Sequence, residues 1–221
     1  MKKIVILDFD GTIADTKPVI LETFHRTFDV EGLPQSTDTQ ISSTIGLPLL
    51  EAFPVLCPMN HDKAEKCVNT YREIFENVNR EIKPQLFPHV TDTLRRLHAL
   101  GVICSIATSR GYASATSFMQ SFGLNDIITY IVAAENVSHA KPNPEPVTKT
   151  LHHFSIEAKD AVVVGDTHFD IHMGRNAGCM TIGVSYGYGS KESLLEAGAD
   201  FIIGDFSKLT LFIADALSKG A

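Results

Sequence analysis

The sequence predicts an α/β fold: a Rossmann-like parallel sheet with helices on both faces and a small helical domain inserted after the first strand. Short apolar runs alternate with amphipathic stretches, which is typical of a parallel sheet covered by helices. One long interval has helical patterns but no convincing strand, and acidic residues follow two of the apolar runs. The expected strands are Ile4 to Leu7, Val102 to Ala107, Tyr130 to Ala134, Ala161 to Val164, Met180 to Val184 and Phe201 to Ile203.

The interval 15–83 accounts for the inserted domain. Its first helix is expected from about Lys17 to Phe28, with Asp15 or Thr16 as the N-cap. A second, longer helix is expected to begin at the capping-box pattern Asp62-x-x-Glu65 and to end before Pro84. The chain is therefore divided into an α/β core domain, 1–14 and 84–221, and a helical domain, 15–83.

The composition indicates a soluble protein that acts on a small molecule. The chain has 221 residues, of which 44% are hydrophobic, enough for a substantial core. Its net charge of −7 provides no overall attraction for nucleic acid or an anionic membrane. The apolar run before Asp8 is too short for a signal peptide or a membrane span. Four cysteines without a C-x-x-C pair favour reduced thiols and a cytoplasmic location, and both a monomer and a homodimer remain open.

The first strand runs directly into Asp8-Phe9-Asp10-Gly11-Thr12. Open α/β sheets bind ligands at the carboxyl ends of their strands, and strand alternation puts Asp8 and Asp10 on one side. Two carboxylates this close need positive compensation, for which a divalent cation is the simplest candidate. The alternative is an ordinary Asp-Gly turn after a buried strand.

A second acidic pair follows a later strand, in Gly165-Asp166-Thr167-His168-Phe169-Asp170. With the first pair it would complete a site for Mg²⁺, which prefers carboxylate and water oxygens. Asp170 could instead cap the helix that follows.

Two further segments offer groups that bind phosphate. Thr108-Ser109-Arg110 lies between a strand and a helix, where hydroxyls and free backbone N–H groups bind anions, although Thr and Ser are also common helix caps. Lys141 lies in a proline-rich loop and would offer a fixed ammonium group, although a lone Lys is usually solvated. Because these segments all follow strands of one parallel sheet, their side chains can converge.

Taken together, the four motifs resemble those of the haloacid dehalogenase superfamily of hydrolases, particularly its phosphoglycolate-phosphatase-like branch. The motifs are Asp8-x-Asp10-Gly11-Thr12, Thr108-Ser109, Lys141-Pro142-x-Pro144 and Gly165-Asp166-Thr167-x-x-Asp170, and the resemblance covers nearly the whole chain. It implies that the helical insertion is the α-helical cap domain of that family.

The resemblance also implies roles for individual residues. Asp8 would be the nucleophile that forms an aspartyl-phosphate, and Asp10 the general acid and base. Mg²⁺ would be held by Asp8, the backbone carbonyl of Asp10 and Asp166, with Asp170 contributing directly or through water or Lys141. Thr108 and Lys141 would neutralise the phosphoryl oxygens. The further residues expected to bind substrate are Gly11, Thr12, Ser109, Arg110 and Gly46, the last in a loop that could also be a simple interhelix turn.

These implications predict a Mg²⁺-dependent phosphatase for a small phosphorylated metabolite such as phosphoglycolate. Asp10 argues against a dehalogenase, because dehalogenase members of the superfamily lack this second acid. A phosphomutase similar to β-phosphoglucomutase, an inorganic pyrophosphatase and a non-catalytic phosphate-responsive switch remain alternatives. Tyr186 and Tyr188, after a predicted strand, would either form a floor beneath the cap or simply pack.

Overall fold

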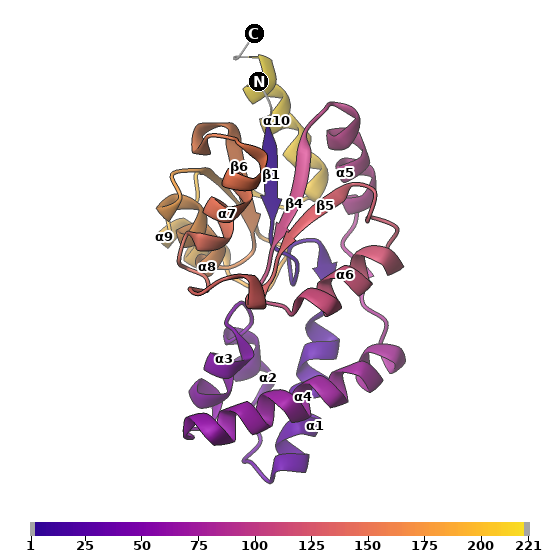
Figure 1. The fold of residues 1–221 in the computed structure, drawn as a ribbon, viewed down its shortest axis with the longest axis vertical. Coiled ribbons are helices and arrows are strands. Elements are labelled where there is room, and N and C mark those ends of the chain that lie inside the picture. Colours follow the sequence, from indigo (N-terminus) through magenta and orange to yellow (C-terminus); the bar gives the residue numbers. More distant parts are fainter. Residues whose placement is uncertain (1–2, 219–221) are drawn as a thin grey trace.

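The structure, a computed structural model, describes residues 3–218, with side chains as far as residue 213. Its main sheet has six strands in the order β5-β4-β1-β6-β7-β8, and all neighbouring strands are parallel (Figure 1). This confirms the Rossmann-like α/β fold. The strands are β1 (Ile4–Leu7), β4 (Ile103–Ala107), β5 (Ile128–Val132), β6 (Ala161–Gly165), β7 (Met180–Val184) and β8 (Phe201–Ile203).

Helices cover both faces of this sheet. Val5 and Leu7 of β1 face a core shared with α5 (Val90–Ala99), α6 (Tyr112–Ser121) and α10 (Leu209–Ser218). Ile4 and Ile6 point the other way, toward α7 (Glu145–Phe154) and α8 (His168–Asn176). Neighbouring residues of a strand point to opposite faces, so the continuous apolar run of β1 supplies both cores. A short helix, α9 (Lys191–Glu196), packs against α8 and β7.

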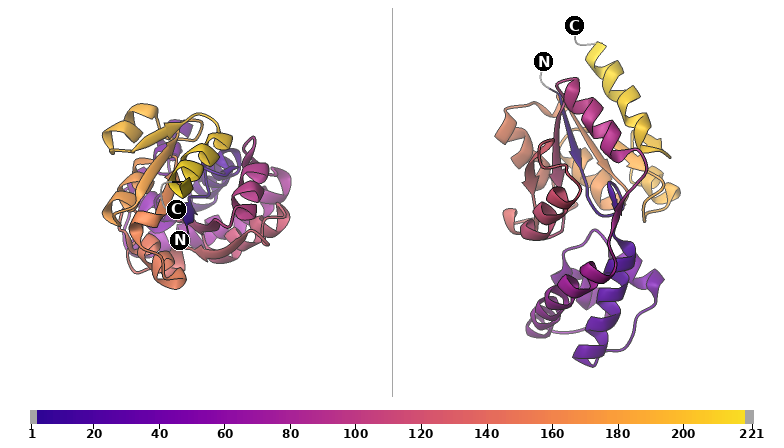
Figure 2. Two further views of the ribbon diagram at one scale, coloured as in Figure 1. Left: turned by 90° about the horizontal axis from the view of Figure 1, so that it is seen from above. Right: turned by 90° about the vertical axis from the view of Figure 1, so that its right-hand side faces the viewer.

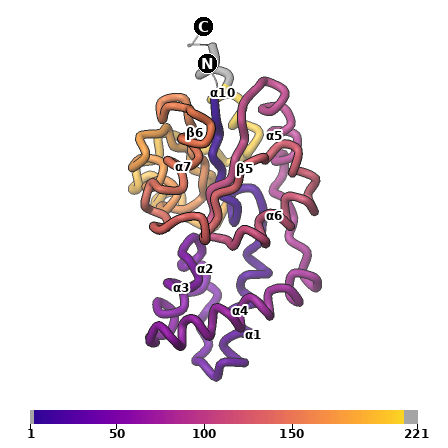
Figure 3. The backbone as a smooth tube through the Cα atoms, viewed as in Figure 1, coloured from indigo at the N-terminus to yellow at the C-terminus, as the bar shows by residue number. Residues whose placement is uncertain are grey.

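The helical insertion lies beyond the carboxyl edge of the sheet (Figure 2). Figure 3 shows the chain leaving the sheet after β1, forming four helices and returning to α5. The long helices α1 and α4 pack together, and Phe24, Phe28, Phe53 and Tyr71 form an aromatic cluster among α1, α3 and α4. The four helices are α1 (Lys17–Glu31), α2 (Asp38–Ser43), α3 (Leu49–Leu56) and α4 (His61–Glu81).

A two-stranded antiparallel ribbon joins the insertion to the sheet. It pairs β2 (Ala14–Asp15) with β3 (Gln85–Leu86), so both crossings between the two parts lie side by side. The sequence did not predict these strands, because two residues are too few to show a period. Within residues 3–218, no helix is both long and apolar enough to cross a membrane.

Several predicted element boundaries were wrong, by one residue at the start of β4 and the end of β6 and by more elsewhere. The strand expected at Tyr130 to Ala134 runs from Ile128 to Val132, because β5 is an edge strand and tolerates the exposed Thr129. Helix α1 continues to Glu31, where Gly32 ends it in the left-handed conformation (φ 63°). Helix α4 begins at His61, and its N-cap is Asn60, whose side chain accepts a 3.0 Å hydrogen bond from the Lys63 N–H.

Candidate active site

The carboxyl ends of β1 and β6 bring the two acidic pairs together. Asp8 follows β1, and its N–H continues the sheet by donating to the carbonyl oxygen of Val164 in β6 (2.8 Å). Asp166 follows β6 directly. Because β1 lies between β4 and β6, the segment Thr108 to Arg110, which follows β4, reaches the same edge. The parallel topology thus assembles residues that are distant in sequence.

Asp8, Asp166 and Asp170 form a buried carboxylate cluster. Each offers an oxygen, and these three oxygens lie within 4.8 Å of one another. Asp166 accepts hydrogen bonds from the Thr12 hydroxyl (3.0 Å) and the Tyr188 N–H (2.7 Å). Fixed, buried oxygens at this spacing are the donor set that a hard divalent cation such as Mg²⁺ prefers, so the residues fit a metal site.

Lys141 is the ammonium group beside this cluster. It is only 4% exposed, and its Nζ donates to Asp8 Oδ1 (2.5 Å) and to Asp170 Oδ1 (2.6 Å). Asp170 uses its other oxygen to accept from the N–H (3.0 Å) and the hydroxyl (2.7 Å) of Thr167 at the start of α8. Asp170 is therefore the third helical residue of a capping box at the start of α8 and also anchors Lys141, while its contact with a metal stays a prediction.

Burial sets the protonation behaviour of the cluster. It raises the pKa of Asp8 to about 7, against the opposing attraction of Lys141. Burial and the neighbouring carboxylates Asp170 and Asp8 likewise raise the pKa of Asp166. Although burial opposes it, the pKa of Lys141 is raised by Asp170 and Asp8. One ammonium faces three carboxylates, and a divalent cation would balance the remaining charge.

Two glycines allow the backbone to pack closely around Asp166. Gly11 has a φ of 86°, and a Cβ there would lie 2.2 Å from Asp166 Oδ2. A Cβ at Gly187 would lie 2.3 Å from the Cβ of Asp166. Any larger residue at either position would have to displace the carboxylate, so these glycines are part of the site's geometry.

Asp10 lies outside the carboxylate cluster and has different partners. Its carboxylate accepts a hydrogen bond from the Thr16 hydroxyl (2.5 Å) and forms a two-point ion pair with Arg110. The Arg110 guanidinium also lies 5.1–5.3 Å from the ring centroids of Phe9, Phe75 and Phe118. Asp10 was expected to act as the general acid and base and to contact the metal through its carbonyl, and Arg110 was expected to bind substrate. In this structure the two side chains contact each other.

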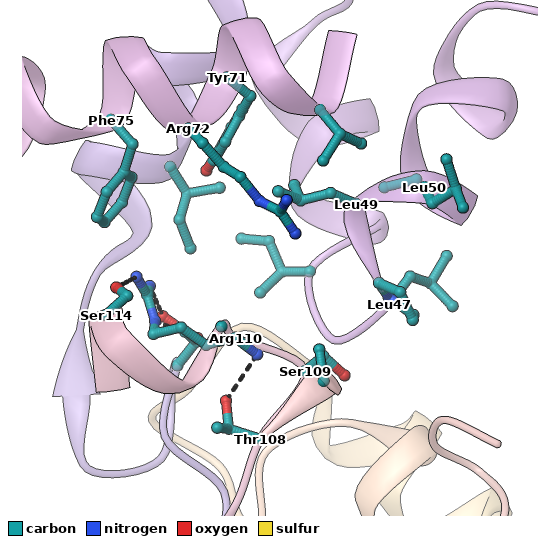
Figure 4. A pocket seen from close by; sticks show the side chains of 18 of the residues that line it. Leu47, Leu49, Leu50, Tyr71, Arg72, Phe75, Thr108, Ser109, Arg110 and Ser114 are labelled. Atoms are coloured by element: carbon teal, nitrogen blue, oxygen red, sulfur yellow. Dashed lines mark hydrogen bonds and ion pairs between the residues drawn. The ribbon is translucent and has the colours of Figure 1, made fainter. Parts of the chain in front are cut away.

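A cavity of about 730 Å³ opens above these residues, between the sheet edge and the helical insertion. Asp8, Asp10 and Thr108 line it from the sheet edge, and side chains of α1, α3 and α4 line it from the helical insertion. Figure 4 shows Thr108 on one side of this space and Tyr71 and Arg72 on the other. The Ser109 hydroxyl donates to the carbonyl oxygen of Gly46 (2.6 Å), which joins the sheet edge to the loop before α3. Gly46, Ser109 and Arg110 line the cavity, and their binding of substrate stays a prediction.

Other predicted residues lie around the cavity or behind it. Lys141 sits behind Asp8, and Thr12 is fully buried and supports Asp166. The binding roles of Gly11 and Thr12 and the metal contact of the Asp10 carbonyl stay predictions.

Tyr188 connects the two parts of the molecule through contacts that the sequence did not predict. Its hydroxyl accepts hydrogen bonds from the N–H groups of Thr16 (2.7 Å) and Lys17 (2.8 Å) and so caps the start of α1. The Thr16 side chain makes no capping bond, because it donates to Asp10 instead. The repeated Tyr-Gly pattern after β7 was the available signal, but nothing in it identifies α1 as the partner.

The cavity-lining positions of Tyr71, Arg72 and Phe75 were also not predicted. Helical periodicity distinguishes a buried face of a helix from an exposed one, but it does not distinguish a packed face from a cavity wall.

Comparison with known proteins supports the resemblance seen in the motifs. The sequence model of the haloacid dehalogenase-like hydrolases matches residues 5–184. The chain is 32% identical to the probable phosphatase IndB of Dickeya dadantii, over 95% of this chain and 92% of that protein. It is 28% identical to the pyrophosphatase PpaX of Anoxybacillus flavithermus, over 93% of this chain and 94% of that protein.

Among solved structures, a haloacid dehalogenase-like hydrolase from Bacteroides fragilis superposes with a TM-score of 0.89 at 26% identity. The superposition covers 95% of this chain and 100% of that one. The chain therefore belongs to the haloacid dehalogenase-like hydrolase family and is related to its phosphatases.

Proposed function

We propose that this protein is a Mg²⁺-dependent phosphatase that hydrolyses a small phosphorylated metabolite through an aspartyl-phosphate on Asp8. The observation that carries this proposal is the position of Asp8. Its carboxylate lines the base of the cavity, contacts the buried ammonium of Lys141 and belongs to the cluster with Asp166 and Asp170. A carboxylate nucleophile beside an ammonium group and a site suited to a divalent cation is what phosphoryl transfer requires.

In the first step, a carboxylate oxygen of Asp8 attacks phosphorus, and the bond from phosphorus to the leaving oxygen breaks. Asp10, which also lines the cavity, gives its proton to that oxygen. Arg110 and Thr16 orient the Asp10 carboxylate that remains after this transfer and that serves as the base in the second step. Lys141 and Thr108 offset the negative charge on the phosphoryl oxygens.

In the second step, water attacks the phosphorus of the aspartyl-phosphate. Asp10 now accepts a proton from that water, inorganic phosphate leaves and the Asp8 carboxylate is regenerated. When bound by Asp8, Asp166, Asp170 and the Asp10 carbonyl, Mg²⁺ supplies charge compensation for the phosphoryl group.

The helical domain, 15–83, would act as the cap over this site. The side chains with which this domain lines the cavity are separate from the core residues proposed to hold phosphate. They are therefore suited to select the leaving group. Closure by such a domain also excludes water from the reacting centre. The family resemblance suggests phosphoglycolate as one substrate of this class. The four cysteines are free, in keeping with a cytoplasmic enzyme.

The test is hydrolysis of a chromogenic aryl phosphate, with Mg²⁺ or with EDTA, by wild type and Asp8→Asn. We expect sustained Mg²⁺-dependent turnover by wild type and none by the variant, with unchanged circular dichroism. Full activity of Asp8→Asn would reject the nucleophile. A single phosphorylation without turnover would indicate a switch, and transfer to glucose 1-phosphate with a bisphosphate primer would indicate a mutase.

Pyrophosphate hydrolysis is a second candidate function, because relatives over nearly the full chain are named pyrophosphatases. Comparing kcat/KM for pyrophosphate and for phosphomonoesters under the same Mg²⁺ concentration separates the two activities.

A further inference from the structure

The wall of the cavity opposite Asp8 is lined mostly by apolar side chains. Side chains of α1, the loop before α3, α3 itself and α4 contribute to it, and Figure 4 shows Leu49, Tyr71 and Phe75 directed into this space. The apolar lining residues contributed by the helical insertion include Ile20, Phe24, Leu47, Leu49, Val68, Tyr71 and Phe75. A wall of this kind is stabilised by covering it with apolar ligand surface, because that removes the wall from water.

The charged groups lining the same wall do not favour a second anion. Arg72 extends from α4 into the cavity, but Glu65 and Glu76 of the same helix also line it. These three groups sum to one negative charge. A leaving group that carries a carboxylate or phosphate would therefore meet Arg72 together with two acids of the same helix, and the net charge of these three groups does not attract a second anion.

Arg110, the other cation lining the cavity, is already paired. Its guanidinium contacts both carboxylate oxygens of Asp10 and donates to the Ser114 hydroxyl (3.0 Å). Binding a second phosphate through Arg110 would break the ion pair that orients Asp10. The cavity volume of about 730 Å³ also lies in the range of sites for organic ligands larger than a two-carbon acid or pyrophosphate.

We propose that the substrate is a phosphomonoester whose alcohol carries an uncharged, apolar group of about the size of an aromatic ring, held between Leu49 of α3 and Val68, Tyr71 and Phe75 of α4. This inference rests on the proposed phosphatase function and specifies its substrate class. Phosphoglycolate and pyrophosphate, which both present a second anion to this wall, are then poor substrates.

The test compares 2-phenylethyl phosphate with ethyl phosphate, two esters of unactivated primary alcohols that differ mainly in the apolar ring. Phosphoglycolate and pyrophosphate complete the series, each with Mg²⁺. We expect kcat/KM for 2-phenylethyl phosphate to exceed that for each of the other three by at least about tenfold, the scale on which apolar pockets discriminate. Equal values for the two esters, or a preference for either second anion, would overturn the inference.

Substitutions in the cavity wall test whether its side chains cause the preference for the apolar ester. Leu49→Ala and Val68→Ala should each lower the ratio of kcat/KM between 2-phenylethyl and ethyl phosphate by at least about fivefold. Val55→Ala, in the same helix as Leu49 but 64% exposed and outside the cavity lining, should keep the wild-type ratio. An unchanged ratio in both wall variants, each checked for folding by circular dichroism, would refute the assignment.

The two levels of proposal fail differently. Hydrolysis of some phosphate compounds without a preference for the apolar ester overturns only the substrate class. Absence of Mg²⁺-dependent turnover across the whole series overturns the phosphatase function and the substrate class together.

Discussion

At the scale of single residues, the contacts of Lys141 give the most specific expectation. Lys141→Ala removes the ammonium that contacts Asp8 and Asp170, so kcat should fall by at least about a hundredfold. The measurement is steady-state hydrolysis of an aryl phosphate, corrected for folded protein. Lys149→Ala is the matched control, because Lys149 is an exposed lysine that pairs with Glu145. A Lys141→Ala enzyme within a few-fold of wild type would reject this role.

The raised pKa of Asp8 predicts how Mg²⁺ affinity depends on pH. Below its pKa of about 7, Asp8 holds a proton in the metal-free protein, and Mg²⁺ must displace that proton to bind. The affinity should therefore weaken as pH falls, by roughly tenfold between about pH 8 and about pH 6 for one such group. Calorimetric titrations at several pH values measure this slope, and Asp8→Asn should reduce it. A pH-independent affinity would contradict the competition.

Residue identities at the site could be predicted better than their contacts. Asp8, Asp166 and Lys141 were predicted because each follows a strand of a parallel sheet, and topology alone brings such positions to one edge. The pairing of Asp10 with Arg110 was not predicted. It depends on how the segment between β4 and α6 lies beside the end of β1, and Arg110 also packs on Phe75, which belongs to the helical insertion.

At the scale of elements, the start of α4 offers two candidate capping residues that can be compared. The sequence favoured Asp62-x-x-Glu65 as a capping box, whereas Asn60 caps the helix in the structure. Asn60→Ala should destabilise the protein by about 1 kcal/mol, since it leaves the Lys63 N–H without its side-chain acceptor. Asp62→Ala, which removes only a charge from the first turn, should cost less. Urea denaturation measures both, and a larger loss for Asp62→Ala would contradict the assignment.

Most strands and long helices could be predicted because their apolar patterns extend over several residues. The shifted edge strand β5 and the ribbon β2–β3 could not. An edge strand has a neighbouring strand on one side only, so it can keep exposed residues and its apolar pattern is weaker. A two-residue strand exists only because its partner strand lies beside it.

At the scale of the whole molecule, metal binding should stabilise the folded state, because the carboxylate cluster forms only when β1 and β6 are paired. Mg²⁺ at about a hundredfold over its Kd should raise Tm by about 5–10 °C. Asp166→Asn should lose most of this shift. Asp205→Asn, which changes an acid outside the cluster that pairs with His89, should keep it. Thermal melts with Mg²⁺ or EDTA give the comparison, and an equal shift in both variants would argue against the cluster as the binding site.

The fold class followed from the alternation of strands and helices, but the placement of the insertion over the sheet edge did not. That placement depends on a few contacts from distant segments, such as the Ser109–Gly46 hydrogen bond and the hydroxyl of Tyr188 at the start of α1. None of them leaves a periodic signal in the sequence.

The packing of Arg110 against Phe75 offers an optical probe of the molecule. Phe75 belongs to the helical insertion, whereas Arg110 and Phe118 belong to the sheet domain, and the chain has no tryptophan. Phe75→Trp would thus introduce a single indole between the two parts. Its fluorescence would record, in real time and without an attached dye, whether the parts separate when ligand arrives or leaves.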